Sequence, residues 1–79
     1  MRKIIGSIDI GSDEIKIIVG EIFDGELNVL CALSEETKGM KENRVVNEEL
    51  FIQNVTRMIE NISDRLGFKV KNCELRTVS

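Results

Sequence analysis

Several residue types on which enzymes and nucleic-acid-binding proteins depend are missing from this 79-residue chain. There is no histidine, which excludes a Ser-His-Asp or Cys-His catalytic group and any histidine-ligated metal. Tryptophan and tyrosine are absent and there are only three phenylalanines, so stacking surfaces for single-stranded nucleic acid are not expected. The net charge of −3 also provides no large basic surface. We therefore expect no nucleic-acid partner.

Proline is absent as well, and cysteine occurs only twice. A chain without proline does not look like a linker-rich, modular protein. Two thiols cannot complete a zinc site by themselves, so we interpret Cys31 and Cys73 as small buried apolar residues that stay reduced. No apolar run reaches signal-peptide length or the roughly 20 residues of a membrane span. These features predict a cytoplasmic location.

The hydrophobic pattern predicts three strands, one helix and a final strand. The predicted strands occupy residues 3–10, 14–23, 26–36 and 69–78. A turn at Gly11 separates the first two, and Asp24-Gly25, a strong hairpin signal, separates the second from the third. Residues 37–46 are polar and predict a loop with at most a short extended segment at residues 44–46.

A helix is predicted between Asn47 and Gly67. Asn47 is a good N-cap residue, and Glu48 and Glu49 place negative charge where the helix dipole favours it. Gly67 can adopt the left-handed conformation that ends a helix. Apolar residues recur at helical spacing and predict one buried face, formed by Ile52, Val55, Ile59, Ile62 and Leu66.

The element order β-β-β-α-β predicts an α/β fold with a mixed sheet of strand order 3-2-1-4 and one helix on one face. Consecutive apolar residues in the first two strands, Ile4-Ile5 and residues 17–19, point to opposite faces of that sheet. One helix can cover only one of these faces. Either the chain is an incomplete piece of a larger domain, or it self-associates; the alternative is an ordinary two-layer domain with some exposed isoleucine.

The turn after the first strand has the residues best suited to binding a phosphate. Gly11 lets the backbone approach an anion, and successive N–H groups of Gly11, Ser12 and Asp13 can form an anion-binding concavity. Lys16 can add a positive charge. Asp9 would repel a phosphate directly and therefore suits a position near Mg²⁺, in contact through water. The residues alone leave open a plain polar hairpin in which Asp9 caps the turn.

Residues 7–12, followed by Lys16 and by residues 19–21, resemble the first phosphate motif of the actin-like ATPase superfamily. Within it, the chain is most similar to the FtsA-like bacterial cell-division proteins. That resemblance continues in three further segments, which are Gly39-Met40, Val46-Asn47 at the start of the long helix, and residues 75–79.

The resemblance implies a fold and a site. Residues 1–79 would be the incomplete N-terminal part of the first nucleotide-binding subdomain, which has a ribonuclease H-like architecture. Gly11, Ser12, Asp13 and Lys16 would contact the phosphates of ATP, and Asp9 would lie near Mg²⁺, in the full-length parent. No cofactor is expected on the fragment itself.

The resemblance also implies partners and activity for the parent. An FtsA-like parent would bind ATP, polymerise, and link FtsZ to the inner face of the membrane through parts absent here. The fragment alone is expected to be inactive as an ATPase, because phosphoryl transfer needs several converging groups. Unpaired strand edges lead us to expect self-association, as a dimer. Two alternatives stay open: a self-contained interaction module without nucleotide binding, and a piece of another superfamily member, such as a sugar kinase or a chaperone.

Overall fold

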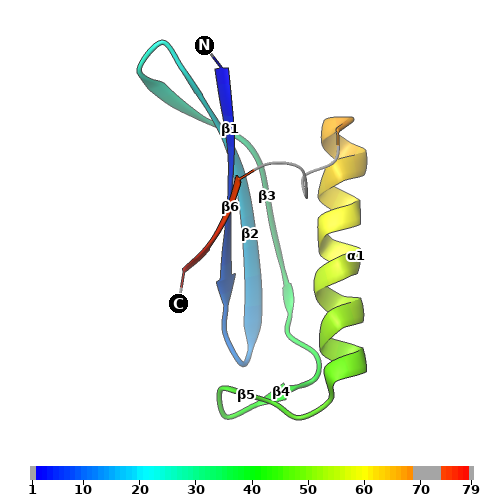
Figure 1. Ribbon diagram of the computed structural model, residues 1–79. Coiled ribbons are helices and arrows are strands. Elements are labelled where there is room, and N and C mark those ends of the chain that lie inside the picture. Colours follow the sequence, from blue (N-terminus) through cyan, green and yellow to red (C-terminus); the bar gives the residue numbers. More distant parts are fainter. Residues whose placement is uncertain (1, 69–73, 79) are drawn as a thin grey trace.

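The computed structural model describes residues 2–68 and 74–78 of the chain. It is a small α/β arrangement of a mixed sheet, one helix and a short hairpin (Figure 1). The elements are β1 (Arg2–Ile10), β2 (Glu14–Phe23), β3 (Glu26–Glu36), β4 (Met40–Lys41), β5 (Arg44–Val45), α1 (Glu48–Leu66) and β6 (Glu74–Val78). The predicted α/β fold class is confirmed. Residues 69–73, which were predicted to begin the last strand, lie outside the described residues.

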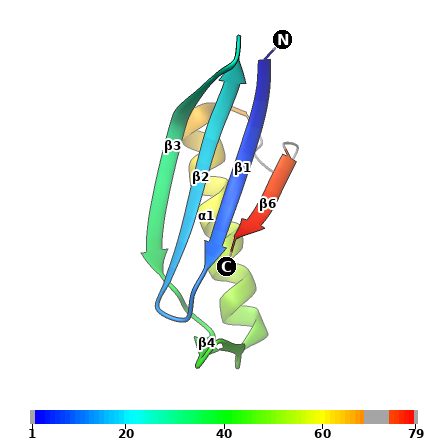
Figure 2. The ribbon, with the colours of Figure 1, turned by 90° about the vertical axis from the view of Figure 1, so that its left-hand side faces the viewer.

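The main sheet has the strand order β3-β2-β1-β6, the order expected from the sequence. The pairs β1–β2 and β2–β3 are antiparallel, and β6 runs parallel to β1. Asp24 and Gly25 both have positive φ, 53° and 79°, as a two-residue type I′ turn requires. Figure 2 shows α1 behind the sheet, so that the opposite sheet face is uncovered.

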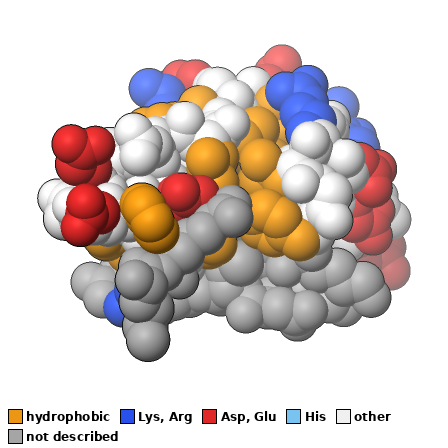
Figure 3. All heavy atoms as spheres, turned by 90° about the horizontal axis from the view of Figure 1, so that it is seen from above, with side chains coloured by type: hydrophobic (Ala, Val, Ile, Leu, Met, Phe, Trp, Pro, Cys, Tyr) orange, Lys and Arg blue, Asp and Glu red, His pale blue; other side chains and the backbone are white. Residues whose placement is uncertain are grey.

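The core lies between the central strand β2 and helix α1. Ile15, Ile17 and Val19 alternate along β2 and are fully buried, as are Met58 and Ile62 of α1. Half-buried apolar residues of β1, β3 and α1 surround this cluster. Seen from above, hydrophobic side chains gather across the middle of the molecule, with charged side chains to either side (Figure 3).

Both predicted helix caps are confirmed. The side-chain oxygen of Asn47 accepts a hydrogen bond from the Leu50 N–H at 3.1 Å. Gly67 has φ of 80° and donates its N–H to the Ser63 carbonyl at 2.8 Å. These local contacts satisfy backbone groups that the helix leaves without intrahelical partners at its two ends.

The predicted buried face of the helix is wrong in part. Ile52 is 61% exposed, whereas Asn54 and Met58 are buried and lie on the same stripe as Ile62. Asn54 lies on the stripe that faces the sheet, where its side-chain oxygen accepts a hydrogen bond from the Lys38 N–H. A pattern of apolar residues alone could not include a buried asparagine.

One cysteine and the loop also differ from expectation. Cys31 is half-buried rather than buried, and Cys73 lies outside the described residues. The polar segment of residues 37–46 contains the β4–β5 hairpin, whose turn residues Glu42 and Asn43 have φ of 51° and 63°. This type I′ turn was not predicted because it lacks the Asn-Gly or Asp-Gly pair that usually signals one.

The sheet face opposite α1 includes an exposed apolar area, as the sequence suggested. Ile18 is 43% exposed, and Val29 and Leu27 are 63% and 67% exposed. Val29 and Leu27 pair with Gly20 and Ile22, which share the face of Ile18. We call this surface, made of Ile18, Gly20, Ile22, Leu27 and Val29, the open sheet face.

Candidate phosphate-binding turn

The turn between β1 and β2 is closed by its own backbone. The Gly11 N–H donates to the Glu14 carbonyl at 3.0 Å, which leaves Ser12 and Asp13 at the tip. A Cβ atom at Gly11 would lie 3.1 Å from that carbonyl oxygen, which is tighter than ordinary contact. Glycine at this position therefore allows the close backbone approach that the turn requires.

Asp9 and Lys16 are direct cross-strand partners on β1 and β2. Both are exposed, and both belong to the rows whose side chains point away from α1, since their neighbours Ile15 and Ile17 point into the core. Lys16 also helps to line a shallow hollow of about 140 Å³ together with Ile18, Ala32, Leu33 and Ser34. The structure thus places a carboxylate and an ammonium group at paired positions of β1 and β2, beside the glycine turn.

Ser12 is engaged by the β4–β5 hairpin. Its hydroxyl donates to the side-chain oxygen of Asn43 at 3.0 Å and accepts from the Asn43 N–H at 2.5 Å. The hydroxyl is therefore part of the contact between the turn and the hairpin tip. A phosphate oxygen that accepted a hydrogen bond from the Ser12 hydroxyl would have to replace the side-chain oxygen of Asn43 as its acceptor.

Thr37 is a residue of the site that the sequence analysis missed. Its hydroxyl donates to the Gly11 carbonyl at 2.7 Å, and its N–H donates to the Asp13 carbonyl at 3.0 Å. Thr37 itself is only 8% exposed, whereas Gly11 is half-buried and Asp13 is exposed. Its one signal in the sequence is a hydroxyl residue that directly follows β3.

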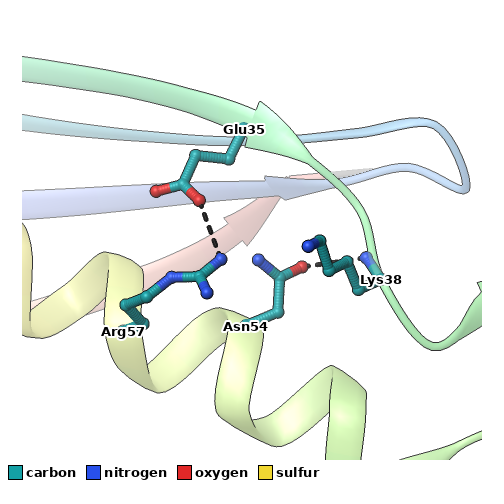
Figure 4. A network of polar contacts seen from close by, with 4 residues as sticks. All are labelled: Glu35, Lys38, Asn54 and Arg57. Carbon is teal, nitrogen blue, oxygen red and sulfur yellow. Dashed lines mark hydrogen bonds and ion pairs between the residues drawn. The ribbon is translucent and has the colours of Figure 1, made fainter.

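A polar network ties the end of β3 to the helix (Figure 4). The buried side-chain oxygen of Asn54 accepts from the Lys38 N–H at 3.0 Å. One turn nearer the helix C-terminus, Arg57 forms an ion pair with Glu35 at 3.1 Å. The two contacts hold the segment that carries Thr37 against α1.

Two other features are absent from the residues that the structure describes. Within residues 2–68 and 74–78, no group of three or more Cys, Asp or Glu side chains is arranged to hold a metal ion. In the same part of the chain, no helix has the length and apolar character needed to cross a membrane.

Solved structures show which larger fold contains this arrangement. A Ppx/GppA family protein of Aquifex aeolicus matches 98% of this chain with a TM-score of 0.62 and 20% identity, over 26% of its own length. An exopolyphosphatase from Cytophaga hutchinsonii matches 95% with a TM-score of 0.67 and 15% identity, over 24% of its length. At these identities the likeness shows the fold alone. The chain has the fold of a piece of an actin-like protein.

Curated relatives by sequence are of two kinds. The cell division protein FtsA of Pseudomonas aeruginosa is 32% identical over 69 residues, which are 86% of this chain and 16% of that protein. FtsA of Bacillus subtilis is 26% identical over 65 residues, 82% of this chain and 15% of that protein. A candidate exopolyphosphatase of Haemophilus influenzae is 35% identical over 72 residues, 86% of this chain and 22% of that protein.

These comparisons agree on the superfamily and not on one member. No family model matches the chain. The chain spans between 15% and 22% of the length of the three curated relatives named above. The expected actin-like superfamily is therefore supported, while the relatives do not single out FtsA.

Proposed function

We propose that this chain is the part of an actin-like protein that holds nucleotide phosphates, with the turn at Gly11, Ser12 and Asp13 as the binding element. The observation that carries the proposal is the pairing of Asp9 with Lys16 directly beside that turn, on the uncovered side of the sheet. The Lys16 ammonium group and the amide groups of the turn are suited to binding a phosphate. The Asp9 carboxylate beside them is suited to binding the cation that accompanies the phosphate.

The local charge predicts which form of the ligand binds. Three carboxylates, those of Asp9, Asp13 and Glu14, lie within a few residues of Lys16, so acidic groups outnumber the base. A bare polyanion would be repelled there. Mg²⁺ removes this repulsion because it binds both carboxylate and phosphate oxygens, either directly or through water. We therefore propose ATP with Mg²⁺ as the ligand, and Asp9 as the residue on the metal side.

Among actin-like proteins, we propose an FtsA-like bacterial division protein as the parent. The relative from Pseudomonas aeruginosa supports this, as does the Gly39-Met40 segment after β3. The parent would then work at the inner face of the membrane and contact FtsZ and the membrane through parts outside these 79 residues.

A second candidate is a polyphosphate-cleaving parent. It is favoured by the 35% identical relative from Haemophilus influenzae and by the fold of the two structural neighbours. The same turn would then hold the phosphates of a polyphosphate chain, and no nucleoside would be required.

Both candidates can be tested on the ¹⁵N-labelled full-length parent, because no cofactor is expected on these 79 residues alone. The ligands are MgATP, ATP in EDTA, and magnesium polyphosphate. We expect amide shifts centred on the turn, which need Mg²⁺ and weaken in Asp9→Asn and Lys16→Gln. The control is Arg65→Gln, at the other end of the molecule. If no ligand shifts the turn, or if Lys16→Gln binds like the control, the proposal is wrong. Much tighter binding of polyphosphate than of MgATP would favour the second candidate.

A further inference from the structure

We infer that Thr37 is a positioning residue for the phosphate-binding turn, which it orients by holding two of the turn's carbonyl groups. The inference rests on the proposed function, because it assigns a task to the turn's amide groups. Thr37 itself does not face the ligand: its hydroxyl and its N–H are both committed, to the carbonyls of Gly11 and Asp13.

The geometry of the peptide bond turns this contact into an orientation. The peptide between Gly11 and Ser12 is planar and trans, so its N–H points opposite to its C=O. Because the Gly11 carbonyl is drawn toward Thr37, the Ser12 N–H is aimed away from Thr37. An anion on that side of the turn meets a donor that is already oriented.

Thr37 can impose this orientation because its own segment is fixed. Asn54 is 1% exposed and accepts the Lys38 N–H, and Gly39 accepts two hydrogen bonds from Val46 and Asn47, at 2.8 and 3.0 Å. The residues that follow Thr37 are thus bound to helix α1 and its N-terminal end. The short turn is bonded to this support through Thr37, which is 26 residues away from Gly11 in the sequence.

The side chain also has the right properties for this task. Threonine is branched at Cβ and has fewer χ1 rotamers open to it, which favours the bonded orientation of its hydroxyl. Its burial means that an unmade bond would cost more than an exposed one. Valine has nearly the same shape without the donor, whereas serine keeps the donor without the branch. The two variants therefore separate hydrogen bonding from packing.

The experiment compares the wild-type chain with Thr37→Val and Thr37→Ser, with Thr56→Val as control, since Thr56 is exposed on α1. Residual dipolar couplings of the Ser12 N–H in this chain report its direction without any ligand, and MgATP titration of the full-length parent that carries the same substitution reports affinity. We expect Thr37→Val to change the coupling and to weaken binding about threefold to tenfold, the effect of one lost hydrogen bond. Thr37→Ser should keep the wild-type coupling and the wild-type affinity, and Thr56→Val should change neither of them.

Three results would overturn the inference. The first is a set of Ser12 couplings in the wild-type chain that disagree with an N–H pointing away from Thr37. This result can be obtained even if Thr37→Val does not fold. The second is an unchanged Ser12 coupling in folded Thr37→Val. The third is a wild-type affinity for MgATP in that variant. If the wild-type parent binds neither MgATP nor magnesium polyphosphate while the couplings behave as expected, the proposed function fails and the orienting contact stands.

Discussion

Replacement of Gly39 by alanine should destabilise this protein more than the same change at any other left-handed glycine of the described chain. Gly39 has φ of 82°, and a Cβ atom there would lie 2.5 Å from the Asn47 carbonyl oxygen and 2.7 Å from the Phe51 nitrogen. Both are backbone atoms at the start of α1, so no side-chain rotation can relieve the contact. The segment after β3 and the helix would have to separate.

The magnitude has two parts. The left-handed backbone costs an alanine about 1–2 kcal/mol. Overpacking against fixed neighbours adds about 1–3 kcal/mol, which brings the sum to about 2–5 kcal/mol. At about 0.05–0.15 kcal/mol per residue, a chain of 79 residues has about 4–12 kcal/mol of total stability. Gly39→Ala should therefore remove a large share of it.

Gly25 and Gly67 provide matched controls. Their φ values are 79° and 80°, but a Cβ atom at either would have no neighbour within 4 Å. Gly25→Ala and Gly67→Ala should cost only the backbone part, about 1–2 kcal/mol. Urea denaturation followed by circular dichroism at 222 nm gives the free energy of unfolding for all three. If Gly39→Ala costs no more than the controls, the close packing of Gly39 against the helix start is wrong.

Further predictions concern the core, association and activity. Ile62→Ala should lower the free energy of unfolding by about 2–5 kcal/mol because this side chain is fully buried. Ile52→Ala, at an exposed position, should lower it by less than about 0.5 kcal/mol. Equal losses in denaturation curves would contradict the observed helix face. The chain should form dimers through its unpaired edge strand β3 or its open sheet face, and light scattering that gives the monomer mass of 8.9 kDa at sub-millimolar concentration would exclude this. The purified chain should not hydrolyse ATP, and phosphate release that disappears in Asp9→Asn would show the opposite.

The sequence alone was sufficient wherever short-range physics decides the conformation. Asp24-Gly25 marked its hairpin because two consecutive positive φ angles suit few residue pairs. The ends of α1 were predicted to the residue, because Asn47 and Gly67 satisfy backbone groups within one turn of themselves. Asp9 and Lys16 were recognised as candidates from their spacing around a glycine turn, and their pairing follows from the register of a two-stranded hairpin.

Tertiary structure decided what depends on residues far apart in the chain. The partner of Ser12 is Asn43, 31 residues away, and the partner of Gly11 is Thr37, 26 residues away. The buried face of α1 includes Asn54, whose side-chain oxygen accepts a hydrogen bond from the Lys38 N–H where β3 ends. Such contacts carry no periodic signal, since one hydrogen bond between two loops requires only that the rest of the fold bring them together. The position of the turn was therefore readable from the sequence, while its hydrogen bonds to Thr37 and Asn43 were visible only in the folded chain.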